Sequence, residues 1–389
     1  MYQILTLNKI AQCGLDKFPA DSYSVTDDVD AKADAVLVRS YKMHDMALPE
    51  NLKAIARAGA GVNNIPIEKC SERGIVVFNT PGANANAVKE LIIASLISCS
   101  RNVVAAANWT RTLEGTADEI SKAAEKGKSM FVGHEISGKT LGVIGLGAIG
   151  AMVANAAHDL GMNVIGFDPF LSVYGALRLS RAVKVTEDIK KLCEEADYIT
   201  LHVPYLEESK KTVDQVLQNV KDGVRILNFS RGELVDDAIM ESALESGKVA
   251  CYVTDFASPA VLKMKNTIVT PHLGASTEES EDNCAKMAAK QLIDYLENGN
   301  IVNSVNFPEC HIPWEGNMRI TIAHKNVPNM LSQFSTVFSN AGVNIENMLN
   351  KSKKDYAYTM IDLNSQVDES ILDKLRTIDG VLNIRVLKK

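Results

Sequence analysis

Three short apolar stretches of the chain each lead into a polar residue that could take part in chemistry. Arg231 follows ILNFS, His202 follows ITL, and His272 stands in TPHLGAS after NTIV. Short apolar runs are typical of strands that are buried on both faces of a parallel sheet. In such a sheet the carboxyl ends of the strands form the edge where ligands bind, so we expect these three side chains to lie there.

An arginine and a histidine at that edge suit the oxidation of a 2-hydroxy acid. The Arg231 guanidinium can hold a carboxylate through two parallel hydrogen bonds. The His272 imidazole can exchange a proton near neutral pH. The reaction also needs a hydride acceptor.

A glycine motif indicates what that acceptor is. Gly145, Gly147 and Gly150 form G-x-G-x-x-G directly after the apolar run LGVI and ahead of a helical pattern that begins near Ala148. The glycines allow a tight turn and let backbone N–H groups at the helix N-terminus meet a pyrophosphate. Asp168 ends the next strand, MNVIGFD, where its carboxylate can accept hydrogen bonds from the ribose hydroxyls. A carboxylate there repels a 2′-phosphate, so the predicted cofactor is NAD.

Alternating strand and helix patterns predict an α/β fold with two doubly wound parallel-sheet domains. A helical pattern at 276–298 can carry the chain back to the first of these domains. The last part of the chain reads β-α-β-β-α-β, the order of a ferredoxin-like sheet. We expect a flavodoxin-like domain at residues 1–100 and 280–303, a Rossmann domain at 101–279, a linker at 304–317 and the βαββαβ domain at 318–389.

Composition excludes several classes of function. A net charge of −7 gives no general attraction to nucleic acid or to an anionic membrane. The seven cysteines are odd in number and never spaced as C-x-x-C, which argues against a disulfide framework and against a zinc site. No basic leader or long apolar run is present. We expect a soluble cytoplasmic protein without a metal.

The motifs GLGAIG, NFSRGELVD and TPHLGAST, together with Asp168, resemble the D-isomer-specific 2-hydroxyacid dehydrogenases. The N-terminal stretches VRS, GAGVNNI and NTPGANANAVKEL are similar to the substrate domain of those members that oxidise 3-phosphoglycerate. The likeness covers nearly the whole chain, and its motifs occur in family order. It implies an NAD-dependent enzyme that oxidises the C2 hydroxyl of D-3-phosphoglycerate at the entry to serine synthesis.

The resemblance also implies roles for individual residues. Arg231 would hold the substrate carboxylate and the C2 oxygen, and His272 would remove the hydroxyl proton as hydride leaves C2. His202 would contribute its backbone and not a proton. The residues implied to bind the cofactor are Gly145, Gly147, Ala148, Ile149, Gly150, Asp168, Val203, Phe229, Ser230, Asp255, Gly274 and Ala275.

One motif departs from the family. Where the family has Asp-Val-Phe-x-x-Glu-Pro, with the Glu orienting the catalytic histidine, this chain reads VTDFASP, with Ser258 before Pro259 and a shorter loop. Two readings stay open for Asp255. It binds the nicotinamide amide and leaves His272 without a carboxylate partner, or it is displaced and hydrogen-bonds His272 itself. We favour the first reading because a residue at a strand end is not easily displaced.

The substrate phosphate has a candidate partner in Arg39 of VRS, with Lys42 nearby. The resemblance places a phosphate-binding arginine at the position of Arg39. The alternative for Arg39 and Lys42 is that each is a solvated charge on the protein surface.

The segment HKNVPNMLSQFSTVFSNAGVNIENM resembles an ACT domain. The resemblance implies L-serine as an effector, held between paired domains by His324, Asn326 and Asn344. Asn329 replaces the glycine of the family's Pro-Gly turn, and asparagine tolerates a positive φ less well. The alternative is an ACT domain that serves only for pairing. In either case we expect a homodimer or a homotetramer.

Two other functions remain open. One is a reductase of glyoxylate, hydroxypyruvate or another small 2-oxo acid. The other is a non-catalytic NAD-binding scaffold, like the transcriptional corepressors built on the same fold. The acidic charge, Arg231, His272 and the ACT-like tail argue against the scaffold.

Overall fold

The computed structural model describes residues 1–205 and 216–389. The chain divides into two compact units. One comprises Met1–Asn84 with Glu278–Lys389, and the other comprises Ala85–Thr277. The domain boundaries expected from the sequence stay a prediction.

The unit Ala85–Thr277 is built on a seven-stranded sheet in the order β12-β11-β10-β9-β6-β7-β8. Every pairing in this sheet is parallel. The sequence order reverses between β6 and β9, which makes the topological switch point of a doubly wound sheet. The strands are β6 Thr140–Ile144, β7 Asn163–Phe167, β8 Lys184–Thr186, β9 Tyr198–Leu201, β10 Val224–Asn228, β11 Val249–Thr254 and β12 Thr267–Val269.

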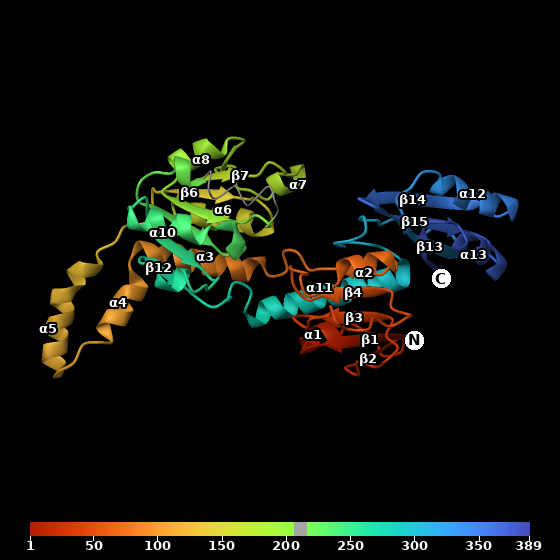
Figure 1. Cartoon of the computed structure of the whole chain (residues 1–389), viewed down its shortest axis with the longest axis horizontal. Helices are drawn as coiled ribbons and strands as arrows, with labels where there is room; N and C mark the ends of the chain where they lie inside the picture. Colours follow the sequence, from red (N-terminus) through yellow and green to blue (C-terminus); the bar gives the residue numbers. More distant parts are fainter. Residues whose placement is uncertain (206–215) are drawn as a thin grey trace. The chain divides into compact units, whose positions relative to one another are not determined.

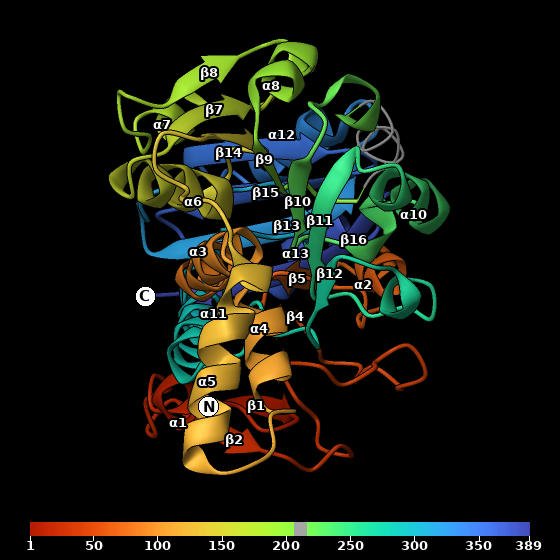
Figure 2. The ribbon, with the colours of Figure 1, turned by 90° about the vertical axis from the view of Figure 1, so that its left-hand side faces the viewer.

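Helices cover both faces of this sheet (Figure 2). Apolar residues of α3 (Ala85–Ser100) and α6 (Ala148–Asp159) form one core cluster with the strands. Those of α8 (Ile189–Glu195) and α10 (Asp237–Glu245) form a second cluster. Burial on both faces explains why the strands read as continuous apolar runs.

A helical arm and several short helices complete this unit. The arm consists of α4 (Val103–Thr110) and α5 (Ala117–Gly127), followed by η1 (Lys128–Phe131) (Figure 1). No residue of α4 is buried. The short helices are α7 Val173–Ala176, η2 Gly232–Leu234 and η3 Val261–Lys263.

The other unit begins with a five-stranded parallel sheet in the order β2-β1-β3-β4-β5. The long helix α11 (Glu278–Asn298) packs its alanine and leucine side chains onto this sheet, so the chain does return to its first domain. The remaining elements are β1 Tyr2–Leu7, β2 Tyr23–Thr26, β3 Ala35–Val38, β4 Ala54–Arg57, β5 Val76–Phe78, α1 Gln12–Leu15 and α2 Ile67–Glu72.

The same unit ends with a four-stranded antiparallel sheet in the order β14-β15-β13-β16. Its helices α12 (Met330–Asn340) and α13 (Glu369–Arg376) bury one face of the sheet. The strands are β13 Met318–Lys325, β14 Ile345–Lys353, β15 Tyr356–Leu363 and β16 Val381–Lys388. This is the β-α-β-β-α-β order of an ACT-like domain. The predicted fold class is therefore confirmed.

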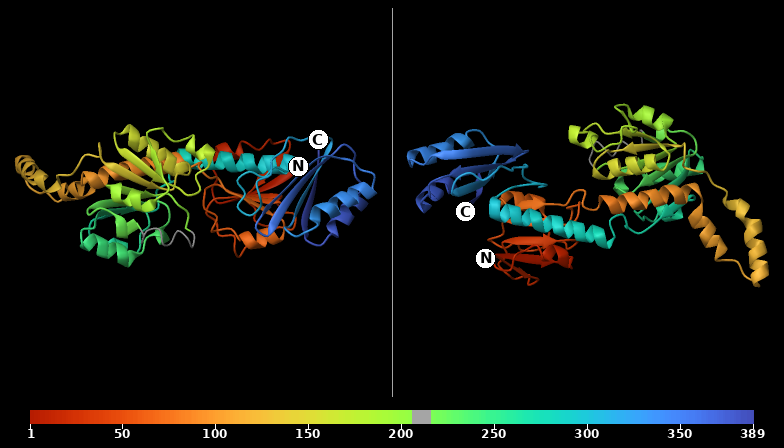
Figure 3. Two further views of the ribbon diagram at one scale, coloured as in Figure 1. Left: turned by 90° about the horizontal axis from the view of Figure 1, so that it is seen from above. Right: turned by 180° about the vertical axis from the view of Figure 1, so that it is seen from behind.

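The second face of the ACT-like sheet packs on the first domain of its unit. Ala323, Tyr358 and Met360 share one apolar cluster with Phe78 and Tyr295. Figure 3 shows α11, in teal, together with the red strands of the first sheet and the blue strands of the ACT-like sheet. The two domains of this unit therefore share one core.

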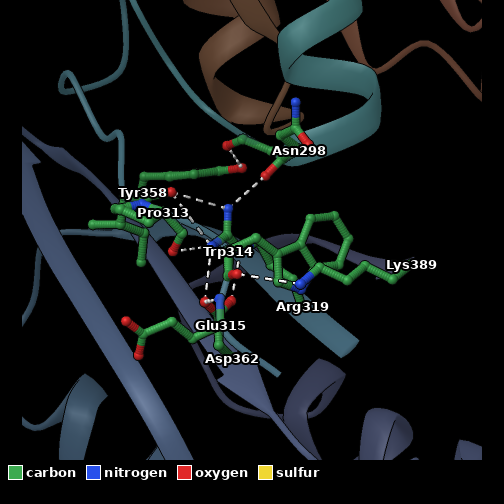
Figure 4. Close-up of polar contacts among 10 residues, drawn as sticks. Asn298, Pro313, Trp314, Glu315, Arg319, Tyr358, Asp362 and Lys389 are labelled. Carbon is green, nitrogen blue, oxygen red and sulfur yellow. Dashed lines mark hydrogen bonds and ion pairs between the residues drawn. The ribbon is translucent and has the colours of Figure 1, made fainter. Parts of the chain in front are cut away.

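A buried arginine stands at the centre of this junction (Figure 4). Arg319 and Asp362 are both fully buried, and the Nε and Nη2 atoms of Arg319 donate to the two carboxylate oxygens of Asp362 at 2.6 and 2.8 Å. The guanidinium also donates to the carbonyl of Asn298 at 3.0 Å and to that of Pro313 at 2.9 Å. It lies 5.0 Å from the ring centre of Trp314. The Arg319 side chain thus contacts the linker, the end of α11 and the ACT-like strand that carries Asp362.

Within the described ranges, no single helix is long and apolar enough to cross a membrane. Helices α3 and α4 pass that test only as a pair, on length and composition, with a bend of 68° between them.

Candidate active site

The carboxyl edge of the seven-stranded sheet collects the residues predicted to act. Gly145 follows β6, Asp168 follows β7, and His202 follows β9. Arg231 comes just after β10, and Asp255 directly follows β11. His272 lies shortly after β12, so all of these residues share one edge because every strand is parallel.

The glycine turn is closely packed at two positions and open at a third. A Cβ on Gly145, where φ is 92°, would lie 2.5 Å from the carbonyl oxygen of His202. A Cβ on Gly150 would lie 1.9 Å from the carbonyl oxygen of Gly145. On Gly147, which precedes the first residue of α6, a Cβ would meet nothing within 4 Å. A ligand can therefore approach the backbone of the helix N-terminus at Gly147.

Asp168 is fixed against that turn. Its Oδ2 accepts a hydrogen bond from the Leu146 N–H at 2.9 Å, and its Oδ1 accepts one from the Phe170 N–H at 2.9 Å. Each carboxylate oxygen has a further lone pair for a hydroxyl donor. An open helix N-terminus beside an anchored carboxylate fits the pyrophosphate and ribose of NAD.

Arg231 is held at the backbone and exposed at its side chain. The Asn228 Nδ2 donates to the Arg231 carbonyl at 2.8 Å, and the Asn228 Oδ1 accepts from the Ser230 N–H at 3.2 Å. The Asn228 carbonyl in turn accepts from Thr254 Oγ1 at 3.0 Å. The guanidinium of Arg231 is exposed and donates to its neighbour's carbonyl, that of Ser230, at 2.5 Å. Such an exposed guanidinium suits a carboxylate ligand.

Asn228 is a residue of the site that sequence reasoning missed. It is fully buried and sets the shape of the loop that carries Arg231. The available signal was an amide directly after the apolar pair Ile226 and Leu227, at the end of the strand VRILN.

Asp255 links the loop after β11 to the loop after β12. Its side chain is 2% exposed, and its Oδ2 accepts from the Gly274 N–H at 3.1 Å. Its Oδ1 has no hydrogen-bond partner among the described residues. Burial raises the pKa of Asp255, while the Gly274 N–H and the nearby His272 oppose that rise. One buried oxygen of this carboxylate is therefore available to a donor, either the nicotinamide amide or the imidazole.

His272 approaches the Arg231 loop through Phe256. The rings of Phe256 and His272 meet edge to face with their centres 5.1 Å apart. A Cβ on Gly232, next to Arg231, would lie 3.2 Å from Phe256 Cβ. Because β10 and β12 both pair with β11, their loops start roughly 10 Å apart. Both long side chains are exposed. The arrangement can hold a carboxylate and accept a proton in one place.

Ser258, which stands where the family has glutamate, has a different partner. Its Oγ donates to the Asp237 Oδ2 at 2.8 Å and accepts from the Val261 N–H at 3.1 Å. Its hydroxyl therefore holds the short helix η3 near the start of α10.

His202 is kept neutral. Burial lowers the pKa of His202 to about 3, and its Nε2 lies 3.0 Å from Thr200 Oγ1. A group with that pKa does not change charge near neutral pH, so His202 is poorly suited to accept the substrate proton.

Other predicted cofactor residues lie along the same edge. Ser230 donates from its Oγ to the Leu201 carbonyl at 2.7 Å. The Phe229 side chain belongs to the core, so only its backbone is offered to a ligand. Ala148, Ile149, Val203 and Ala275 are part-buried.

Arg39 and the predicted effector residues lie in the other unit. Arg39 Nη2 pairs with Glu281 Oε1 at 2.6 Å, and both side chains are about two-fifths exposed. His324 is 2% exposed, and its Nδ1 and Nε2 lie 2.8 Å from the Lys325 carbonyl and 2.9 Å from Thr359 Oγ1. Asn326 donates to the Lys354 carbonyl, and Asn344 donates to Glu346. Asn329 does adopt a positive φ of 69°, just before α12.

The parallel sheet, the glycine turn and the arginine and histidine at one edge define an NAD-dependent dehydrogenase. Residues 93–274 match the family described as "D-isomer specific 2-hydroxyacid dehydrogenase, NAD binding domain". The chain is 31% identical to a D-3-phosphoglycerate dehydrogenase of Haemophilus influenzae over 84% of its own length and 79% of that protein. It therefore belongs to the D-isomer-specific 2-hydroxyacid dehydrogenase family.

Two further relatives carry the same name. A D-3-phosphoglycerate dehydrogenase of Methanocaldococcus jannaschii is 37% identical over 67% of this chain and 49% of that protein. The crystal structure of NAD⁺-bound 3-phosphoglycerate dehydrogenase of Entamoeba histolytica is 28% identical, with a TM-score of 0.62 over 78% of this chain and 98% of that one. The predictions of family, enzyme class and NAD are confirmed.

Proposed function

We propose that the protein oxidises D-3-phosphoglycerate to 3-phosphohydroxypyruvate, the first step of serine biosynthesis. The observation that carries this proposal is the placement of Arg231 and His272 on loops either side of Asp255, with Phe256 between them. The names of the relatives supply the substrate. We place the activity in a reducing cytoplasm, in keeping with seven cysteines that are all free thiols.

In this proposal each residue at the carboxyl edge of the sheet has its own role in the reaction. Arg231 holds the substrate carboxylate and so sets the position of C2. His272 accepts the proton of the C2 hydroxyl. NAD, when bound along Gly147 and Asp168, supplies the hydride acceptor. Asp255 offers one buried carboxylate oxygen, either to the cofactor amide or to His272.

The test is the formation of NADH from 3-phosphoglycerate, with glyoxylate and hydroxypyruvate assayed in the reverse direction. We expect turnover of 3-phosphoglycerate and a loss of at least about a hundredfold in kcat for His272→Asn. Arg231→Gln should mainly raise KM, because it removes one arm of the carboxylate clamp. Turnover of glyoxylate but not of 3-phosphoglycerate would favour the reductase, and NAD binding without any turnover would favour the scaffold.

We further propose that L-serine regulates the enzyme through the ACT-like domain. Asn326 and Asn344 carry exposed amides there, whereas the His324 ring already has partners within the domain. A ligand can regulate only if it binds one state of the protein better than another. Titrating serine against initial rate and thermal midpoint is the test, and no change in either would leave the domain a role in pairing alone.

We also propose that the protein is a homo-oligomer, at least a dimer. The arm carries no buried residue in α4 although its composition is apolar, and Val103, Val104, Met130 and Val132 are exposed. An apolar patch of this kind is typical of a protein interface. Replacing Val103 and Val104 with serine should shift the molar mass in solution toward that of one chain, as measured by light scattering.

A further inference from the structure

Thr254 lies between the two strands that lead to Arg231 and His272. It is the last residue of β11, where it pairs with Asn228 of β10 and with Val269 of β12. Arg231 comes shortly after β10, and His272 comes shortly after β12. Thr254 is fully buried. One side chain at this place can therefore influence the loops on both sides of β11.

The Thr254 hydroxyl forms two hydrogen bonds that hold different loops. Its Oγ1 donates to the Asn228 carbonyl at 3.0 Å and accepts from the Phe256 N–H at 3.2 Å. The second bond closes a turn of the kind that serine and threonine form with the backbone two residues ahead. The Thr254 carbonyl also accepts from the Thr270 N–H at 3.1 Å, just before His272. A hydroxyl has one donor and two acceptor lone pairs, so a single group can serve both loops.

Each of the two side-chain bonds leads to one of the proposed catalytic residues. Asn228, whose carbonyl Thr254 holds, donates from its Nδ2 to the Arg231 carbonyl at 2.8 Å. Phe256, whose N–H Thr254 holds, meets the His272 ring edge to face with the ring centres 5.1 Å apart. The hydroxyl therefore acts on Arg231 through one neighbour and on His272 through another.

We propose that Thr254 is a positioning residue that keeps Arg231 and His272 at one fixed spacing. Because Thr254 is buried, its hydroxyl touches no ligand itself. In the oxidation of a 2-hydroxy acid the guanidinium holds the carboxylate while the imidazole accepts the proton of the adjacent hydroxyl, so a small change in their spacing lowers the rate. The inference rests on the proposed function and adds a residue to which the sequence assigned no role.

The experiment compares two replacements of Thr254. Thr254→Val keeps the shape of the side chain and removes the hydroxyl, whereas Thr254→Ser keeps the hydroxyl and removes a methyl group. NADH formation is measured with 3-phosphoglycerate, or with another 2-hydroxy acid that the parent protein oxidises. We expect Thr254→Val to raise KM and to lower kcat, each by roughly three- to tenfold, because both loops lose a bond. Thr254→Ser should stay within about twofold of the parent protein in both constants.

Three controls separate positioning from a general loss of stability. Both Thr254 variants should lower the thermal midpoint by about 2–4 °C, so stability alone does not distinguish them. The affinity for NAD should stay unchanged, because Gly147 and Asp168 follow other strands. Thr6→Val is a matched variant in the other unit, where the Thr6 hydroxyl donates to the Thr26 carbonyl at 3.2 Å, and it should leave both constants unchanged.

A measurement without turnover separates this inference from the proposed function. The imidazole proton resonances of His272, assigned with the help of His272→Asn, report its position against the Phe256 ring. We expect Thr254→Val to displace these resonances and Thr254→Ser to leave them in place. A parent protein that oxidises no 2-hydroxy acid would refute the proposed function, and the resonances would then still decide whether Thr254 positions His272.

Three results would overturn the role of Thr254. They are kcat and KM of Thr254→Val both within about twofold of the parent protein, a change in only one of these constants, or a Thr254→Ser variant as impaired as Thr254→Val. A change in one constant alone would mean that the hydroxyl serves a single loop. Thr254→Ala, which also lacks the hydroxyl, takes the place of Thr254→Val in every comparison if the valine variant does not fold.

Discussion

At the scale of single residues, the electrostatic environment of the sheet edge separates groups that look alike in the sequence. His202 and His272 both follow strands, but His202 is part-buried and lies within hydrogen-bonding distance of Thr200, whereas His272 is exposed beside Phe256. The difference in burial leaves only His272 suited to accept a proton near neutral pH.

The neutral state of His202 makes stability depend on pH. Its pKa is about 3 in the folded protein and 6.5 without the fold. The unfolded chain therefore binds more protons between those values, and the contribution of His202 is present above pH 6.5 and lost as pH falls toward 3. We expect His202→Gln, which can keep a bond to Thr200, to remove a few kcal/mol of this acid dependence. Urea unfolding at a series of pH values measures it, and an unchanged slope would contradict the assignment.

Asp255→Asn distinguishes the two roles left open for that carboxylate. If Asp255 binds the nicotinamide amide, the variant should bind NAD more weakly, by roughly tenfold. The pH dependence of kcat/KM should then stay as in the parent protein. A displaced basic limb with unchanged NAD affinity would instead show that Asp255 partners His272.

At the scale of elements, the turn from β6 into α6 determines which glycines serve the fold and which serves a ligand. Gly145 allows the turn to pack against the His202 carbonyl, and Gly150 allows the start of α6 to pack against the Gly145 carbonyl. Gly147 has open space where its Cβ would be. Sequence spacing alone treats the three glycines as one motif.

A pair of alanine variants tests that division. Gly145→Ala should destabilise the protein by about 1–3 kcal/mol, because its φ is positive and its Cβ would clash with a carbonyl. Gly147→Ala should change stability by less than about 0.5 kcal/mol, yet weaken NAD binding by blocking approach to the backbone. Thermal unfolding and NAD titration of both variants measure this. Equal losses of stability would contradict the structure.

At the scale of the whole molecule, the ACT-like domain and the first domain share one core around the Arg319–Asp362 pair. The Arg385 guanidinium adds to this junction by donating to the carbonyls of Tyr295 and Leu296, near the C-terminal end of α11, at 2.9 and 2.7 Å. Cations at a helix C-terminus are stabilising. The ACT-like domain therefore contacts the C-terminal end of α11 directly.

The buried pair predicts an asymmetry between single and double variants. Arg319→Met alone leaves the Asp362 carboxylate buried without its partner and should cost about 3–5 kcal/mol. Arg319→Met with Asp362→Leu removes both charges and should recover much of that loss. Denaturant unfolding compares the two. The loss of stability caused by Asp362→Leu alone is the reference for this comparison. If adding Asp362→Leu to Arg319→Met lowers stability by that same amount, the two residues stabilise the protein through their other contacts and not through each other.

Local patterns in the sequence determined the fold class and the edge of the sheet at which the candidate residues lie. Buried strands on a two-sided parallel sheet must be apolar along their whole length, so the runs before Arg231 and His272 located both residues at one edge. The glycine motif and Asp168 depend on spacing within one βα unit, which is local information.

Only the tertiary structure decided the partners of side chains that are far apart in the chain. Ser258 bonds Asp237, Arg39 pairs with Glu281, and Arg319 is buried against Asp362. The Arg319 position in the strand MRITIAHK gave no sign of a charge at a domain junction. Hydrogen bonds and burial depend on distances in space, and sequence periodicity gives the face of an element but not what packs against it.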